Sequence, residues 1–248
     1  MINNNSSTVF GENFFSQESN TLYNKVSLDD SVTKELFLLE RHNTPTSEHS
    51  KGVARLVAEF ACSDIIKLNQ EKQELLVRSA LLHDLGKISI SNIILDKVGK
   101  LSDEEWKEIK EHPVNGFYQY CVRFSDIEAG LPILLHHTMQ MNSYPSNLEQ
   151  KQALSSYDIL YSNLTDEEVL SKTALLAIAD NLEARYPIVD LSHPLIGTRS
   201  YNHRQYTIDE LPQIVRAGFI ESGIIRNIGI SDVLDKTIDF SQELLSKK

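Results

Sequence analysis

The sequence of 248 residues predicts an all-α fold, a bundle of helices with no sheet. Apolar residues recur at the spacing of a helix face in several segments, and residues that favour helix starts precede some of them. We find no strand-rich region and no repeat at a fixed period. The length permits one large domain or two small ones, and we favour a single domain over residues 28–248.

Residues 1–27 precede this predicted domain. They are polar, rich in Asn and Ser, and lack sustained periodicity, so we expect a frayed tail or a weakly docked arm. They also lack the basic start and the apolar stretch of a secretory signal, which favours a cytoplasmic protein. No apolar run reaches the roughly 20 residues that a membrane-spanning helix needs, so no membrane span is expected.

The first predicted helix of the domain begins near Ser47 and carries His49 in its first turn. Its apolar stripe consists of residues at positions i, i+3, i+4 and i+7, which are Val53, Leu56, Val57 and Phe60. A second helix is predicted over 71–84. Two candidate ligands, His83 and Asp84, therefore lie at a helix end.

The sequence predicts several short helices over 88–132, and residues typical of helix starts mark where most of them begin. Segment 88–100 is predicted to be a loop with a short helix. Ser102 begins the next helix, because Glu105 follows three residues later as in a capping box. Pro113 and Pro132 each fit the first turn of a further helix, where a missing N–H loses no hydrogen bond.

The last part of the chain alternates irregular segments with helices. Residues 139–164 are polar and irregular, and a helix is predicted over 166–185. Segment 186–206 contains prolines and a glycine and is predicted to be a long loop. Two closing helices are predicted over 207–220 and 231–245.

Charge and cysteine content narrow the partners and the compartment. With 24 Lys and Arg against 35 Asp and Glu, the formal charge is −11, which repels a polyanion such as duplex nucleic acid. A small phosphorylated substrate held by metal ions is compatible with this charge. Cys62 and Cys121 form no CxxC pair and have no His at zinc-finger spacing, so we expect buried thiols in a reducing compartment.

Imidazole and carboxylate side chains gather near the predicted helix ends. Seven of them are candidate metal ligands: His49, His83, Asp84, His112, His136, His137 and Asp180. A ligand set without thiolate suits iron, manganese, zinc or nickel rather than a structural cysteine site. A single histidine is more often an ordinary core or surface residue. The group is harder to explain that way, because a carboxylate next to the apolar run 80–82 is costly unless a metal or cation compensates it.

A family resemblance rests on the string HDLGK at 83–87, preceded by Ser79-Ala80-Leu81-Leu82. This string resembles the signature of the HD superfamily of metal-dependent phosphohydrolases. The continuation through Gly99-Lys100-Leu101, His112-Pro113 and Gly116 is similar to the HD-GYP branch, an all-helical family of cyclic di-GMP phosphodiesterases. The resemblance covers about residues 45–215 and implies an HD-domain helical bundle.

The resemblance implies a site with two divalent ions, iron or manganese first, with zinc, nickel or magnesium also compatible. It assigns one ion to His49, His83 and Asp180, and the other to His112, His136 and His137, with Asp84 as the bridge. Five of the eight histidines then belong to one site. Two such ions activate a hydroxide for in-line attack on a phosphodiester. Lys87 is placed to contact a phosphoryl oxygen or the hydroxide, so Asp84 and Lys87 are the expected catalytic residues.

The sequence departs from the family pattern after the paired histidines. Thr138 stands where the family has Glu, the following glycines are missing, and the segment is one residue short, although Tyr144 and Pro145 remain. Without its glycines the loop need not follow the same backbone path, which leaves the substrate open. Pro45 stands where three-metal members supply a carboxylate, so two metals are expected.

Four residues are the expected substrate contacts: Lys87, Tyr144, Arg199 and Arg204. The first hypothesis is a phosphodiesterase that opens a cyclic dinucleotide, with cyclic di-GMP as the first candidate. A second is an HD-type hydrolase of another nucleotide or phosphoester. A third is a metal-bound but inactive module that senses a cyclic dinucleotide or binds a protein. A homodimer or a signalling-protein partner is compatible with each.

Overall fold

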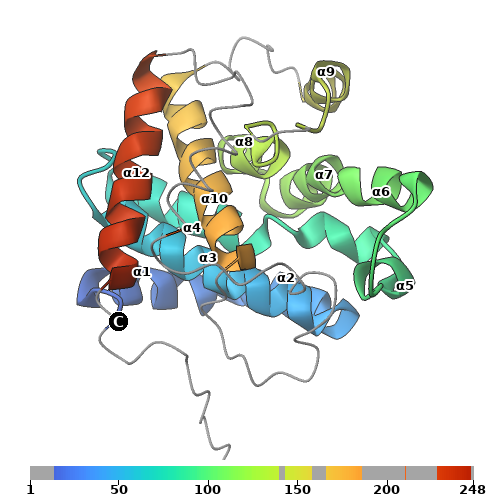
Figure 1. Cartoon of the computed structure of the whole chain (residues 1–248), viewed down its shortest axis with the longest axis horizontal. Coiled ribbons are helices and arrows are strands. Elements are labelled where there is room, and N and C mark those ends of the chain that lie inside the picture. Colours follow the sequence, from blue (N-terminus) through green and yellow to red (C-terminus); the bar gives the residue numbers. More distant parts are fainter. Residues whose placement is uncertain (1–13, 140–142, 158–165, 186–209, 211–227, 247–248) are drawn as a thin grey trace, which may run out of the picture.

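The computed structural model describes residues 14–139, 143–157, 166–185, 210 and 228–246. Over these residues the secondary structure is helical and contains no strand, which confirms the predicted all-α fold (Figure 1). None of the helices in these ranges is long and apolar enough to cross a membrane.

Three helices form the centre of the bundle: α3 (Thr44–Cys62), α4 (Gln70–Leu82) and α10 (Glu167–Arg185). Helix α3 packs against both of the others, and the predicted stripe from Val53 to Phe60 is buried in the main core, as expected. The helix begins three residues before the predicted Ser47. Its start is fixed by the side chain of Asn43, which accepts a hydrogen bond from the backbone N–H of Thr46.

The segment after α4 carries four short elements on one side of the bundle (Figure 1): η1 (Leu85–Ser89), α5 (Asn92–Leu95), α6 (Asp103–Lys110) and α7 (His112–Phe124). The predicted loop with a short helix over 88–100 is confirmed. The capping box of Ser102 and Glu105 is present, and Pro113 lies in the first turn of α7. A small apolar cluster, which includes Ile90 and Ile109, holds these elements together.

The predicted role of Pro132 is wrong. Helix α8 (Ile127–Leu135) begins five residues earlier, where the side chain of Asp126 accepts a hydrogen bond from the N–H of Ala129. Pro132 therefore lies inside the helix, where its missing N–H removes one backbone hydrogen bond. Asp126 is the better start signal, since an Asp side chain satisfies the first free N–H groups of a helix.

The prediction of a tail or weakly docked arm is wrong for residues 17–27. They form helix α1 (Gln17–Ser27), which packs against α3 and α4, and its residues Leu22, Tyr23 and Val26 are buried. The buried carboxylate of Glu59 on α3 accepts hydrogen bonds from the backbone and hydroxyl groups at the start of α1. This anchor comes from another helix, so the local pattern does not show it. Residues 1–13 lie outside the described residues.

Helix α2 (Asp30–His42) follows α1 and packs against α3, α4 and η1. Helix α9 (Asn147–Ser155) lies within the segment that was predicted to be irregular, which corrects that prediction. Its start is a second capping box, formed by Ser146 and Glu149, whose spacing is visible in the sequence.

The predicted helix over 166–185 is confirmed as α10, and the last predicted helix is confirmed as α12 (Ile228–Ser246), which packs along α10 (Figure 1). The predicted loop 186–206 lies outside the described residues, and so does the predicted helix 207–220 apart from residue 210. The fold thus places α10 between α3, α8 and α12.

Candidate metal centre

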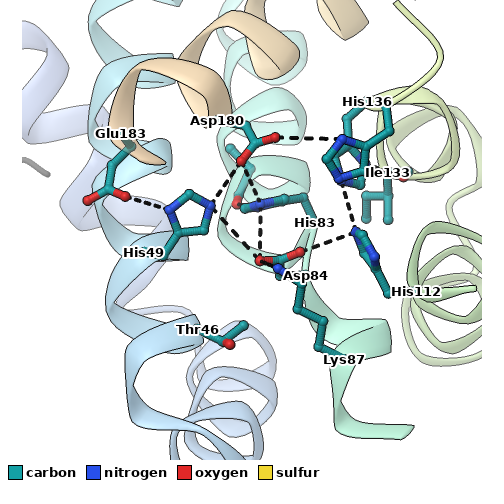
Figure 2. Close-up of polar contacts among 12 residues, drawn as sticks. Thr46, His49, His83, Asp84, Lys87, His112, Ile133, His136, Asp180 and Glu183 are labelled. Carbon is teal, nitrogen blue, oxygen red and sulfur yellow. Dashed lines mark hydrogen bonds and ion pairs between the residues drawn. The ribbon is translucent and has the colours of Figure 1, made fainter. Parts of the chain in front are cut away.

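The structure brings all seven candidate ligands to one place: His49, His83, Asp84, His112, His136, His137 and Asp180. All of them except His137 are labelled in Figure 2. They come from α3, the junction of α4 and η1, the start of α7, the end of α8, and α10. The site is therefore assembled where several helices end against the two long helices α3 and α10.

Three of the histidines are held by the same local arrangement. The Nδ1 atoms of His83, His112 and His136 lie 2.8, 2.7 and 2.7 Å from the backbone carbonyl oxygens of the residues three positions earlier, Ala80, Ile109 and Ile133. Carbonyls in the last turn of a helix lack an intrahelical partner, so the ring N–H satisfies one of them. Since Nδ1 donates, the lone pair of Nε2 faces the centre of the site.

The first cluster consists of His49, His83 and Asp180. His49 Nε2 lies 3.0 Å from Asp180 Oδ1, and His83 Nε2 lies 4.0 Å from the same oxygen. Burial lowers the pKa of His49, but the charge of Glu183 and hydrogen bonds to Asp180 and Glu183 raise it to about 10. Burial opposes ionisation of Asp180, yet the hydrogen bond with His49 and the nearby histidines hold its pKa below the usual range.

A metal ion fits the first cluster because His83 Nε2 needs a partner. This atom is buried, and it has no hydrogen-bond partner among the described residues. A buried nitrogen without a partner is destabilising. Burial also lowers the pKa of His83, so its imidazole is neutral and Nε2 is free to act as a ligand.

The second cluster consists of His112, His136 and His137, whose ligand nitrogens lie within 4.8 Å of one another. The Nε2 atoms of His112 and His136 are 3.2 Å apart, and burial lowers the pKa of both rings well below the ordinary value. Neutral imidazoles at this spacing suit a divalent transition metal. Tyr144 stacks on His137, with 4.5 Å between ring centroids and 29° between planes.

Asp84 lies between the two clusters and is 1% exposed. Its Oδ1 is 3.4 Å from His112 Nε2, whereas its Oδ2 is 3.5 Å from His83 Nε2 and 4.0 Å from His49 Nε2. Lys87 Nζ lies 2.6 Å from Oδ2. Burial opposes ionisation, but Lys87 and the histidines outweigh it and hold the pKa of Asp84 well below its usual range. One carboxylate oxygen thus faces each cluster.

Comparison with known proteins identifies the family of this site. The model of the HD domain matches residues 46–185, which is more than half of the chain. The chain belongs to the HD-domain family. The matched range includes all seven candidate ligands and ends at the last residue of α10.

Several curated proteins are similar to part of this HD domain. A cyclic di-GMP phosphodiesterase of Vibrio cholerae is 33% identical over 116 residues, which are 44% of this chain and 23% of that protein. A 3′3′-cGAMP-specific phosphodiesterase of the same organism is 41% identical over 71 residues, 27% of this chain and 14% of that protein. A cyclic di-GMP phosphodiesterase of Pseudomonas aeruginosa is 32% identical over 123 residues, 47% of this chain and 28% of that protein.

The matched stretch therefore spans less than a third of the length of these relatives. The family predicted from the HDLGK string is confirmed, and the relatives support its HD-GYP branch.

The glycine of the HD motif has a steric role. A Cβ on Gly86 would lie 2.1 Å from the backbone oxygen of His112 and 2.5 Å from the backbone nitrogen of Gly116. The backbone of η1 therefore touches the first turn of α7, and any side chain at Gly86 would force them apart. This contact sets the distance between His83 of the first cluster and His112 of the second.

Among the described residues, sequence reasoning missed Glu183 as part of the HD-domain site. Its carboxylate is fully buried, and Oε2 lies 2.5 Å from His49 Nδ1. Two signals were available. Glu183 follows Asp180 by three residues, so both lie on one face of α10, and Gly52 stands at the same spacing after His49 on α3.

Two of the four expected substrate contacts lie in the described part of the chain. Lys87 and Tyr144 lie beside the clusters, whereas Arg199 and Arg204 lie outside the described residues. Pro45 is in the first turn of α3, and Glu48 is paired with Lys51 at 2.7 Å. Neither therefore adds a carboxylate ligand in this structure.

Proposed function

We propose that this HD domain is a metal-dependent phosphodiesterase that hydrolyses a cyclic dinucleotide. The observation that carries the proposal is the position of Asp84, whose two carboxylate oxygens face two separate clusters of ligands. A lone structural metal would need one cluster and no bridging group. Two adjacent ion sites joined by a carboxylate are typical of enzymes that act on phosphate esters.

In this proposal His49, His83 and Asp180 hold one divalent ion, and His112, His136 and His137 hold the other. Iron or manganese is the first choice, because imidazole and carboxylate ligands without thiolate suit them, and zinc, nickel or magnesium is the alternative. When bound, two such ions would supply a nucleophile from water at neutral pH and would neutralise charge on the phosphate.

Lys87 acts on the phosphate in this mechanism. Its ammonium group lies against Asp84 and is partly exposed, at 21% of the side chain. It is therefore both anchored in the site and open to a substrate, and it stabilises negative charge on a phosphoryl oxygen. The half-buried Tyr144 is proposed as a stacking surface for a base, and Arg199 and Arg204 as further phosphate contacts.

Cyclic di-GMP is the first candidate substrate, because two of the similar proteins described above are named for it and a third for 3′3′-cGAMP. Hydrolysis of a 3′–5′ phosphodiester would give a linear dinucleotide or mononucleotides. The formal charge of −11 favours a small ligand held by local cations over a long nucleic acid. We also propose a cytoplasmic location and either a homodimer or a signalling-protein partner.

One observation favours a second function, a metal-bound sensor without turnover. Thr138 occupies the position where the family has Glu, and its hydroxyl donates to the carbonyl of Leu135 at 2.7 Å. No carboxylate is available at this position. An HD-type hydrolase of another phosphoester would be a further outcome of the same change.

Metal analysis by mass spectrometry, combined with turnover assays on cyclic di-GMP and 3′3′-cGAMP, tests the proposal. We expect two metal equivalents per chain and hydrolysis that Asp84→Ala abolishes, while the exposed control Asp64→Ala retains it. Protein that takes up no divalent metal would overturn the site. Two equivalents of metal with tight binding but no hydrolysis of either dinucleotide would favour the sensor.

A further inference from the structure

His49 differs from the three buried histidines of the site in what holds its ring. His83, His112 and His136 donate Nδ1–H to carbonyls of their own backbone. His49 Nδ1 instead lies 2.5 Å from Oε2 of Glu183, on a different helix (Figure 2). The orientation of this one ligand therefore depends on a side chain that is 134 residues away in sequence.

Glu183 is a fully buried carboxylate, at 0% exposure. Burying a charged group is costly unless a specific partner compensates it. The hydrogen bond from Nδ1–H fixes the tautomer and the ring plane of His49, because the opposite nitrogen must then point away from Glu183. That nitrogen, Nε2, lies 3.0 Å from Asp180 Oδ1 and 4.0 Å from Asp84 Oδ2.

Gly52 provides the space that Glu183 occupies. A Cβ at this position would lie 2.7 Å from Oε1, 2.8 Å from Cγ and 2.9 Å from Cδ of Glu183. Such contacts are too short for any side chain, so the carboxylate would have to move. Gly52 lies inside α3, one turn after His49, where an Ala would otherwise favour the helix. A glycine at this point is explained by the close approach of Glu183.

We propose that Glu183 is a positioning residue for the metal ion of the first cluster, and that Gly52 leaves the space that the Glu183 side chain occupies. The inference rests on the proposed two-metal function. Glu183 does not touch the ion. It holds His49 Nε2 toward Asp180 and Asp84 and raises the basicity of the ring, as a carboxylate behind a metal-bound histidine does. The second cluster has no part in this arrangement, because two of its rings are held by backbone carbonyls.

The test is a titration of the full chain with Mn²⁺, after treatment with a chelator, followed by calorimetry and by the spin resonance of free Mn²⁺. Glu183→Gln keeps the shape of the side chain and removes its charge. We expect it to lower the Mn²⁺ affinity of one of the two metal equivalents about 10- to 100-fold. The other equivalent keeps its affinity. Glu59→Gln is the matched control, since it neutralises another buried carboxylate, one that anchors α1.

Gly52→Ala gives an independent test that leaves every ligand in place. The added methyl displaces Glu183, so the Mn²⁺ affinity of the same equivalent falls about tenfold. In the Glu183→Ala background the methyl has nothing to displace, and Gly52→Ala then has no further effect on affinity. Thermal unfolding of each variant, recorded by circular dichroism, separates altered affinity from a loss of fold.

The outcomes distinguish the two proposals. Wild-type protein that binds no Mn²⁺ would overturn the proposed function together with this inference. The inference alone would be overturned if wild-type protein binds two equivalents of Mn²⁺ and the Glu183→Gln and Gly52→Ala variants bind both equivalents as tightly as wild type. Weakening of one equivalent in protein that hydrolyses no cyclic dinucleotide would support the inference and overturn the catalytic proposal.

Discussion

The two ligand clusters are built in different ways. The second cluster contains imidazoles alone, and two of its three rings are fixed by backbone carbonyls three residues earlier in the chain, near the ends of α6 and α8. The first cluster combines imidazole with carboxylate, and its ligands come from α3, α4 and α10, which are far apart in sequence. Local geometry therefore orients two of the three rings of the second cluster, whereas in the first cluster it orients only His83, and His49 depends on the packing of α3 against α10.

This difference bears on metal preference. Three imidazole ligands favour zinc, iron or nickel, while carboxylate ligands also suit manganese and magnesium. The charges of Asp180 and the nearby Glu183 make the first cluster the more negative of the two. Asp84 is the group that both clusters share, so its loss should have the largest effect.

Asp84→Asn is expected to reduce kcat on the order of 10⁴-fold, since it removes the charge that faces both proposed ions. Metal content should fall in both clusters, and Lys87 loses its ion-pair partner. Steady-state kinetics and metal analysis on the same preparation measure this. Two tightly held equivalents in the variant would show that Asp84 is not the bridge.

His136→Ala should reduce kcat about 10³-fold, because an ion of this kind contributes several kcal/mol of charge stabilisation. The effect on metal content separates the clusters. One equivalent is lost, and the ion at His49, His83 and Asp180 remains. His42 is not part of the site, but it is partly buried and its ring contacts Ile90, so Lys34→Ala at an exposed position of the same helix is the cleaner control. Loss of both equivalents would mean that the clusters cannot be filled separately.

Gly86→Ala changes the spacing of the clusters without removing a ligand. The Cβ would collide with the backbone of His112, and a misplacement of about 1 Å in an active site can reduce kcat about 10²-fold. Overpacking of this kind also destabilises the fold by about 1–3 kcal/mol. Gly116→Ala is the matched comparison, since its shortest contact is 3.2 Å and its effect should be smaller. Equal melting temperatures and rates for the two variants would contradict this reading.

The same contrast explains which parts of the site could be predicted from the sequence. His83, Asp84 and His112 belong to compact motifs at helix ends, whose meaning is local, and the structure brings them together as expected. Glu183 and Gly52 were missed because their pairing joins α10 to α3 and depends on the packing of the two helices. The spacings of three residues from Asp180 to Glu183 and from His49 to Gly52 place each pair on one helix face, but they do not show that the two faces meet.

In the fold, too, the features with a local sequence signal were predicted, and those that depend on tertiary contacts were missed. The long helices α3 and α10 were predicted, α3 from its regular apolar stripe and α10 from the continuous apolar run 174–179, which is buried in the core. Helix α1 was missed because its docking depends on the buried Glu59 of α3. Pro132 was misplaced because a proline inside a helix looks like a proline at a helix start when only the local sequence is considered.

Tyr144→Ala should have the smallest effect and act through the second cluster. The ring of Tyr144 stacks on His137 and lies 6.0 Å from His112 between centroids, so its removal exposes one face of the cluster but takes away no ligand. If the ring also stacks against a substrate base, KM rises about tenfold while both metal equivalents remain, since such stacking is worth about 1–3 kcal/mol. Tyr144→Phe keeps the ring and should keep KM. A tenfold rise in KM for Tyr144→Phe as well would assign the role to the hydroxyl group, and an unchanged KM for Tyr144→Ala would exclude Tyr144 as a substrate contact.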